Sequence, residues 1–267
     1  MARRLPVILV LISLAGFVHS KVAAQQPFTT DDSDVTELHH FHFQFSNQYD
    51  LLQRQERPTL DQNTADFELD YGLLPNLEVG VELPYISFIN SADTIPRSVS
   101  GIGDMNFSSK YNLHKEHEHS FWPAMSVAMN IEFPTGSVSR QLGSGLTDYY
   151  VNGVLQKSLT KVTKLRLNGG ILFAGNETTG LLGIKARGTV LTASGSLVKE
   201  INPKLQLGAE LAGAAQGNLE LDKGQFEGRV GGNYQFAKRA TLDFSVVAGK
   251  FIASPRLGAL LGISIDF

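Results

Sequence analysis

Apolar and polar residues alternate along most of this chain after residue 35. In the last stretch every second residue from Leu257 to Phe267 is apolar, and the positions between carry small or polar residues, with Leu260 as the exception. A period of two with one apolar side is typical of a β-strand whose two faces meet different surroundings. Twelve such stretches can be traced, at residues 36–49, 60–73, 77–85, 103–114, 121–133, 146–159, 165–174, 189–199, 205–213, 225–236, 241–250 and 257–267.

The connections between these stretches alternate in length. Tight turns are predicted at residues 74–76, 201–203 and 237–239, and the longer connections fall at residues 87–100, 134–145, 175–188 and 214–224. Short turns on the periplasmic side, long loops outside and an even number of strands are the pattern of bacterial outer-membrane barrels. The sequence therefore predicts an all-β fold, a transmembrane antiparallel up-and-down β-barrel of about 12 strands.

A soluble periplasmic β-sandwich would also alternate apolar and polar residues. Two observations favour the barrel. The polar face is rich in small residues and amides, and the apolar face carries aromatic residues near the ends of strands, where membrane girdles lie: Tyr71, Tyr85, Tyr149 and Tyr234.

Both ends of the chain point to export. Arg3 and Arg4, an apolar run over residues 5–18 and the small residues at 22–24 predict a signal peptide over residues 1–24. Residues 25–35 are expected to form a periplasmic or lumenal segment, and residues 36–267 the barrel. The terminal Phe267 resembles the last residue of outer-membrane barrels, where the insertion machinery reads a terminal aromatic. That machinery and the outer-membrane lipids are the expected partners, and the bacterial outer membrane the expected location.

Composition and charge exclude several other functions. Cleavage removes three of the 23 basic residues and none of the 26 acidic ones, and a mildly acidic protein is unsuited to nucleic acid. There are no cysteines, so disulfides and thiol chemistry are absent. Two histidine clusters, at residues 39–42 and 114–119, fall near the periplasmic rim, where we expect solvated side chains and no metal site. No cofactor is expected.

An enzyme is the other class that we considered. Outer-membrane phospholipases also have twelve strands and need a serine and a histidine on the lipid-facing wall. Here only His39 falls on the apolar face, near the rim, and no G-x-S-x-G motif occurs. The sequence predicts that the protein is not an enzyme.

The polar face of the predicted strands is acidic. Carboxylates inside a barrel need water, ionic partners or protonation. A structural salt-bridge network that fills the lumen and a narrow acidic path for a cationic or neutral solute both remain open. With a water-filled lumen, Arg229→Ala is expected to be mild. The lumen-facing candidates are Glu68, Asp70, Glu82, Lys110, Glu132, Asp148, Arg166, Glu210, Glu227 and Arg229.

Four segments carry a family resemblance: PFTTDDSDVTE at 27–37, GIGDMNFSSKYNL at 101–113, IEFPTG at 131–136 and LGSGLTDYYVNGVLQKSL at 142–159. The chain resembles the outer-membrane family labelled "Putative MetA-pathway of phenol degradation", whose members are treated as transporter-like. Asp104 and Pro134, from the second and third segments, are expected at the extracellular mouth. The resemblance and the pattern together predict a passive transporter or channel for small solutes, aromatic or hydrophobic ones among them. The alternative is a structural or adhesive barrel with a closed lumen.

Overall fold

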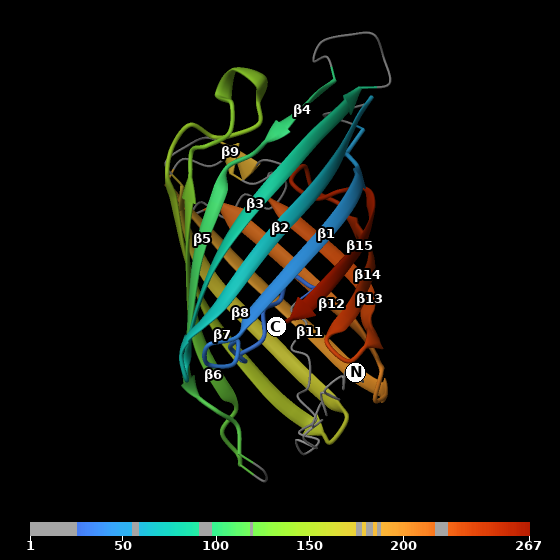
Figure 1. Ribbon diagram of the computed structural model, residues 1–267. Coiled ribbons are helices and arrows are strands. Elements are labelled where there is room, and N and C mark those ends of the chain that lie inside the picture. Colours follow the sequence, from blue (N-terminus) through green and yellow to red (C-terminus); the bar gives the residue numbers. More distant parts are fainter. Residues whose placement is uncertain are drawn as a thin grey trace, which may run out of the picture.

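The computed structural model describes residues 26–54, 59–90, 98–117, 120–174, 178–179, 184–185, 188–216 and 224–267. Its main feature is an antiparallel barrel in which each strand pairs with its neighbours in the chain and β1 also pairs with β15 (Figure 1). The barrel strands are β1 (Phe41–Leu51), β2 (Leu60–Leu74), β3 (Leu77–Asn90), β5 (Met105–His114), β6 (Ala124–Phe133), β7 (Asp148–Thr160), β8 (Thr163–Ala174), β11 (Gly188–Asn202), β12 (Leu205–Gln216), β13 (Gln225–Ala237), β14 (Ala240–Gly249) and β15 (Leu257–Asp266). The prediction of a twelve-stranded up-and-down barrel is confirmed.

The remaining elements lie in the connections. β4 (Val99–Ile102) precedes β5 and pairs with the extracellular part of β3, and Gly103 and Asp104 separate the two. The predicted stretch at 103–114 therefore begins two residues before β5, and β4 was not predicted as a strand. β9 (Thr178–Thr179) and β10 (Ile184–Lys185) pair with each other, and η1 (Val138–Arg140) is a single turn of 3-10 helix. Within the described ranges, no helix is long and apolar enough to cross a membrane.

The tight turns lie together at one end of the barrel (Figure 1). One connection at this periplasmic end is longer than predicted. In residues 115–123, Glu116 pairs with the Lys157 ammonium at 2.6 Å and accepts the backbone N–H of Ser158 at 2.9 Å, while Lys157 also donates to the Ser120 carbonyl. These contacts fold the connection back onto the start of the β7–β8 turn.

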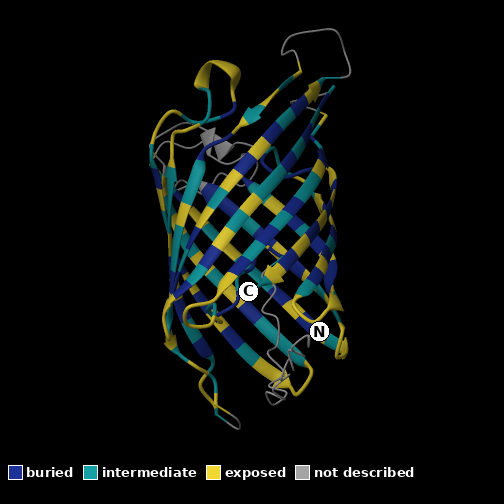
Figure 2. Cartoon of the chain, viewed as in Figure 1, coloured by how far each residue is buried: buried dark blue, intermediate teal, exposed yellow. Residues whose placement is uncertain are grey.

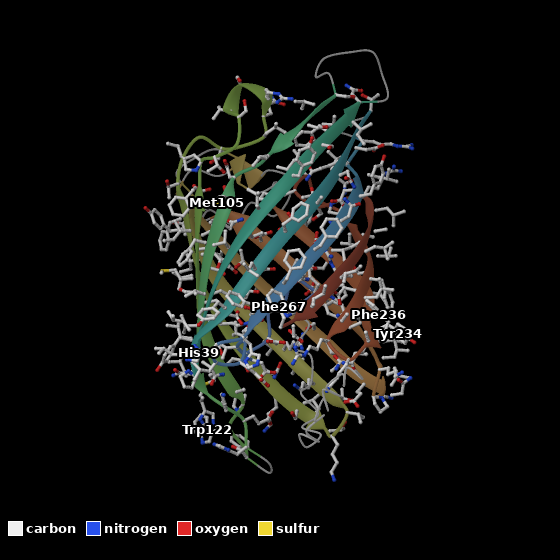
Figure 3. All side chains as sticks on the ribbon, viewed as in Figure 1. His39, Met105, Trp122, Tyr234, Phe236 and Phe267 are labelled. Carbon is white, nitrogen blue, oxygen red and sulfur yellow. The ribbon has the colours of Figure 1, made fainter. Side chains whose placement is uncertain are left out.

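Alternate residues of each strand face the lumen and the outside (Figure 2). Most outward positions are apolar, and many carry large side chains that are more than a third exposed, such as Leu69, Val81 and Ile263. Figure 3 places Tyr234, Phe236 and Phe267 at one level near the periplasmic end. An apolar outer band with aromatic residues at its edge is the lipid-facing surface of a membrane barrel.

The last residue closes the barrel. Phe267 and Phe41 exchange backbone hydrogen bonds of 2.9 and 2.7 Å, and their rings stack at 5.6 Å. On the inner face of the same seam, His42 Nδ1 lies 2.6 Å from Asp266 Oδ1. The alternation that identified the C-terminal strand therefore also places the residues that join it to the first.

Candidate functional site

The inner wall carries every residue that the sequence assigned to the lumen. All ten candidates occupy inward positions, and they differ in burial. Glu68, Glu82 and Glu132 are partly exposed, whereas the others are buried: Asp70, Lys110, Asp148, Arg166, Glu210, Glu227 and Arg229. The buried group identifies the part of the lumen that is filled.

Residues 26–38 do much of this filling. They precede β1 and lie inside the periplasmic half of the barrel (Figure 1). Phe28 is 6% exposed and Ser33 and Thr30 are fully buried, although the segment has no regular secondary structure. The Phe28 ring lies so close to Gly208 of β12 that a Cβ there would be 2.8 Å from its Cζ. We call residues 26–38 the lumenal segment.

Glu210 and Arg229 hold one end of the lumenal segment. Glu210 Oε1 accepts the Thr29 hydroxyl at 2.7 Å, and its Oε2 accepts the Thr30 N–H at 2.5 Å. The Arg229 guanidinium donates to the Pro27 carbonyl at 3.1 Å and lies 3.8 Å from both Glu210 and Glu227. A carboxylate that accepts backbone N–H groups and an arginine that donates to a carbonyl form charge-assisted hydrogen bonds, which are stronger than neutral ones.

Two aspartates hold the middle of the lumenal segment. Asp31 lies 3.2 Å from the Lys110 ammonium, which also lies 3.5 Å from Glu78. Asp32 lies 3.1 Å from the Arg166 guanidinium. Burial alone would raise the pKa of Asp32, but Arg166 and Lys110 hold the pKa of that carboxyl below its usual value. The acidic motif of the segment thus neutralises the two basic side chains on β5 and β8.

Further hydrogen bonds complete the attachment of the segment to the wall. The Ser33 carbonyl accepts from Asn112 Nδ2 and from the Ser126 hydroxyl, each at 2.7 Å. Glu78 Oε2 accepts both the N–H and the hydroxyl of Thr36, at 2.6 and 2.7 Å. The segment therefore contacts β3, β5, β6, β8, β12 and β13, and it restricts the lumen from several sides.

A second set of contacts shapes the extracellular mouth. Asp104, in the break between β4 and β5, accepts the N–H of Gly136 at 2.8 Å and the N–H of Ser144 at 2.6 Å. The Thr135 hydroxyl donates to the Gly103 carbonyl at 2.9 Å and accepts the Met105 N–H at 2.9 Å. We call this arrangement the clasp. It brings three of the four resemblance segments together, because each supplies one side of it.

The clasp turns the loop of residues 134–147 inward. A Cβ on Gly143 would lie 2.4 Å from Asp104 Oδ1, so only glycine fits beside the carboxylate. Leu142 is 3% exposed and packs with four inward-facing side chains at the upper ends of β1–β3, namely Leu52, Leu60, Ile86 and Phe88. Pro134 is exposed and follows the last residue of β6, as expected for a residue that cannot donate to a strand ladder. The loop narrows the mouth from one side.

Replacing Asp104 with alanine should free this loop. Two backbone N–H groups would lose a charged acceptor, and a hydrogen bond to a charged group contributes about 1.5–3 kcal/mol. Trypsin should then cut after Arg140, which is exposed and donates to the Ser100 carbonyl, several times faster than in the native barrel. Asp61→Asn, on the outer face of β2, is the matched control. An unchanged rate of cleavage at Arg140 would mean that Asp104 does not hold the loop.

Two of the described histidines, His39 and His42, have separate partners. His39 Nδ1 lies 2.9 Å from the Tyr71 hydroxyl, and His42 is buried against Asp266, so His42 is not the solvated rim residue that we expected. In the ranges that the structure covers, no group of three or more histidine and carboxylate side chains could hold a metal ion.

Sequence reasoning missed the partners of the lumenal segment. It left residues 25–35 as either periplasmic or lumenal and assigned no role to Thr29, Thr30, Asp31 or Asp32. It placed Arg166 in the lumen without Asp32, the residue with which the structure pairs it. The signal that was available is the composition of PFTTDDSD, which resembles the polar inner wall more than a flexible leader.

Solved structures share this fold. The COG4313 outer membrane channel from Pseudomonas putida F1 superposes with a TM-score of 0.71 at 15% identity, over 88% of this chain and 98% of that one. NanC porin gives a TM-score of 0.57 at 12% identity, over 84% and 98%, and KdgM porin 0.55 at 9%, over 85% and 99%. These proteins are channels and porins, and the likeness shows that the chain has the fold of an outer-membrane barrel.

No curated protein matches the sequence. The family model described as "Putative MetA-pathway of phenol degradation" matches residues 29–267, which include the lumenal segment from Thr29, the clasp and every barrel strand. The chain therefore belongs to that family of outer-membrane barrels.

Proposed function

We propose that the protein is a passive outer-membrane channel for small solutes whose passage is restricted by the lumenal segment. The observation that carries the proposal is the polar inner wall. A barrel needed only as an anchor or a scaffold could fill its lumen with packed side chains. Here inward carboxylates such as Glu82 and Glu132 remain partly exposed on the extracellular side of the lumenal segment.

The family description and the porin-like fold support the same function. Diffusion needs no catalysis, and we propose no enzymatic role. The solute would be small, because the lumenal segment occupies the periplasmic half and the clasped loop narrows the mouth. The apolar residues beside the clasp suit solutes with an aromatic or hydrophobic portion.

Swelling of liposomes that contain the mature chain tests this function. Small neutral solutes should enter measurably faster than into liposomes without protein, and entry should fall steeply as solute size rises. A barrel that is folded by heat-modifiability on a gel but admits no solute of any size would be a closed structural barrel. The deep burial of Thr30 and Asp32 favours this second function, because it shows that the lumenal segment is tightly enclosed by the barrel.

A further inference from the structure

Two sets of carboxylates on the inner wall differ in their partners. Near the lumenal segment, Glu78 pairs with Lys110, and Glu210 and Glu227 pair with Arg229. Farther toward the extracellular end, four carboxylates have no lysine, arginine or histidine within 4.0 Å among the residues that the structure describes: Asp66, Glu68, Glu82 and Glu132. In the described part of the chain, basic side chains therefore lie beside the segment and not beside these four carboxylates.

Three of the four unpaired carboxylates form a continuous row. Glu68 on β2 is the register partner of Glu82 on β3, Glu82 of Asn106 on β5, and Asn106 of Glu132 on β6. Register partners on one face of a sheet have Cβ atoms about 4.5–5.5 Å apart, and like charges at that distance repel. Asn106 donates to Glu82 at 3.2 Å but brings no charge. A positively charged solute would relieve this repulsion.

Gln44 gives an independent reason to place a ligand here. It faces inward on β1 as the register partner of Glu68, so it extends the same row by one strand. Its side chain is 2% exposed, yet neither Nε2 nor Oε1 has a hydrogen-bond partner. A buried amide without partners is costly, and its oxygen is an acceptor suited to an ammonium or guanidinium N–H.

We propose that the row formed by Gln44, Glu68, Glu82 and Glu132 binds small organic cations as they cross the barrel. This inference deepens the proposed channel function and rests on it. The carboxylates are spread over successive strands, and none of the described side-chain groups could hold a metal ion. The row therefore suits a protonated amine or a guanidinium that moves from one carboxylate to the next.

The exposure of the row agrees with contact by a solute. Glu68, Glu82 and Glu132 are each partly exposed although they face inward, whereas the paired Glu78 and Glu210 are buried. Along β3 the next inward residues after Glu82 are Pro84 and Ile86, which are apolar. A cation that carries an aromatic or alkyl portion could place its charge on the row and its apolar part beside Pro84.

Ion selectivity is the first test. In planar bilayers under a KCl gradient, the native channel should prefer K⁺ over Cl⁻, because acidic rings concentrate cations about tenfold or more. Glu68→Gln/Glu82→Gln should lose most of this preference. Asp61→Asn removes the same charge from the outer face of β2 and should keep it. A conducting channel without cation preference, or one whose preference survives the double substitution, would overturn the inference and leave the channel function intact.

Equilibrium binding is the second test, and it does not require current. Benzylammonium and the neutral benzyl alcohol are titrated by calorimetry into the folded full-length mature barrel. We expect benzylammonium to bind more tightly, and Glu68→Gln/Glu82→Gln to weaken it about tenfold or more while Asp61→Asn does not. Absence of current together with this binding pattern would reject the channel function and retain the cation site. Equal binding of the two probes, or binding that the double substitution leaves unchanged, would overturn the site.

Discussion

Removal of residues 26–35 is expected to raise the single-channel conductance of the barrel severalfold. These residues include Phe28, Thr30 and Ser33, which are buried inside the periplasmic half and bound to strands on several sides of the wall. The barrel strands form their own complete ladder without them, because β1 pairs with β2 and β15 along its whole length. Conductance in planar bilayers, at equal salt, is the measurement.

A full-length variant tests the same point if the shortened chain does not fold. Asp31→Asn/Asp32→Asn keeps the length and shape of the segment but removes the charges that pair with Lys110 and Arg166. It should give a conductance between those of the native and the shortened chains, or more frequent opening. Identical conductance in all three folded proteins would show that the segment does not restrict the lumen.

Arg229→Ala is expected to destabilise the barrel by about 3–5 kcal/mol, the cost of leaving buried carboxylates without their cation. Arg229 is 5% exposed and is the ionic partner of both Glu210 and Glu227. Sequence reasoning alone expected a mild effect, on the assumption of a water-filled lumen. The structure fills the lumen at this level, so the effect should approach that of a dry ion pair. The urea midpoint of the refolded barrel measures it.

Arg239→Ala is the control, because Arg239 lies in an exposed periplasmic turn where its backbone carbonyl makes the hydrogen bond to Asp266. Substitutions at such positions change stability by about 0.5 kcal/mol or less. Removal of Arg229 should also loosen the segment, since Glu210 holds Thr29 and Thr30. A midpoint shift for Arg229→Ala no larger than for Arg239→Ala would indicate that water screens this arginine.

The barrel could be predicted from the sequence because successive side chains of each strand face the lipid and the lumen in turn. Apolar residues suit the first surrounding and polar residues the second. In β15 and the residue that follows it, each outward residue from Leu257 to Phe267 is apolar, and a shift of one position would turn this whole set inward. The positions of Arg166 and Arg229 followed from the same alternation, since an arginine on the lipid face near the midplane costs about 2–4 kcal/mol.

The lumenal segment and the clasp could not be predicted in this way. Residues 26–38 have no period, and their contacts join residues far apart in the chain, such as Thr30 with Glu210. Asp104 was expected at the extracellular mouth, but nothing in the sequence showed that its carboxylate accepts two backbone N–H groups of the loop at 134–147. Polar side chains that bind irregular backbone produce no periodic pattern in a single sequence. They are visible only as short motifs, and the motif does not show which residues they bind.

Hydrogen exchange at the lumenal segment tests the central claim most directly. The amide of Thr30 donates to Glu210, and that of Thr36 to Glu78, inside the barrel. In lipid nanodiscs, peptides that cover residues 26–38 should therefore exchange slowly, as the barrel strands do, and should exchange much faster in Asp31→Asn/Asp32→Asn. Exchange of these peptides at the rate of an unstructured chain in the native protein would contradict the account, because the segment would then lie outside the lumen.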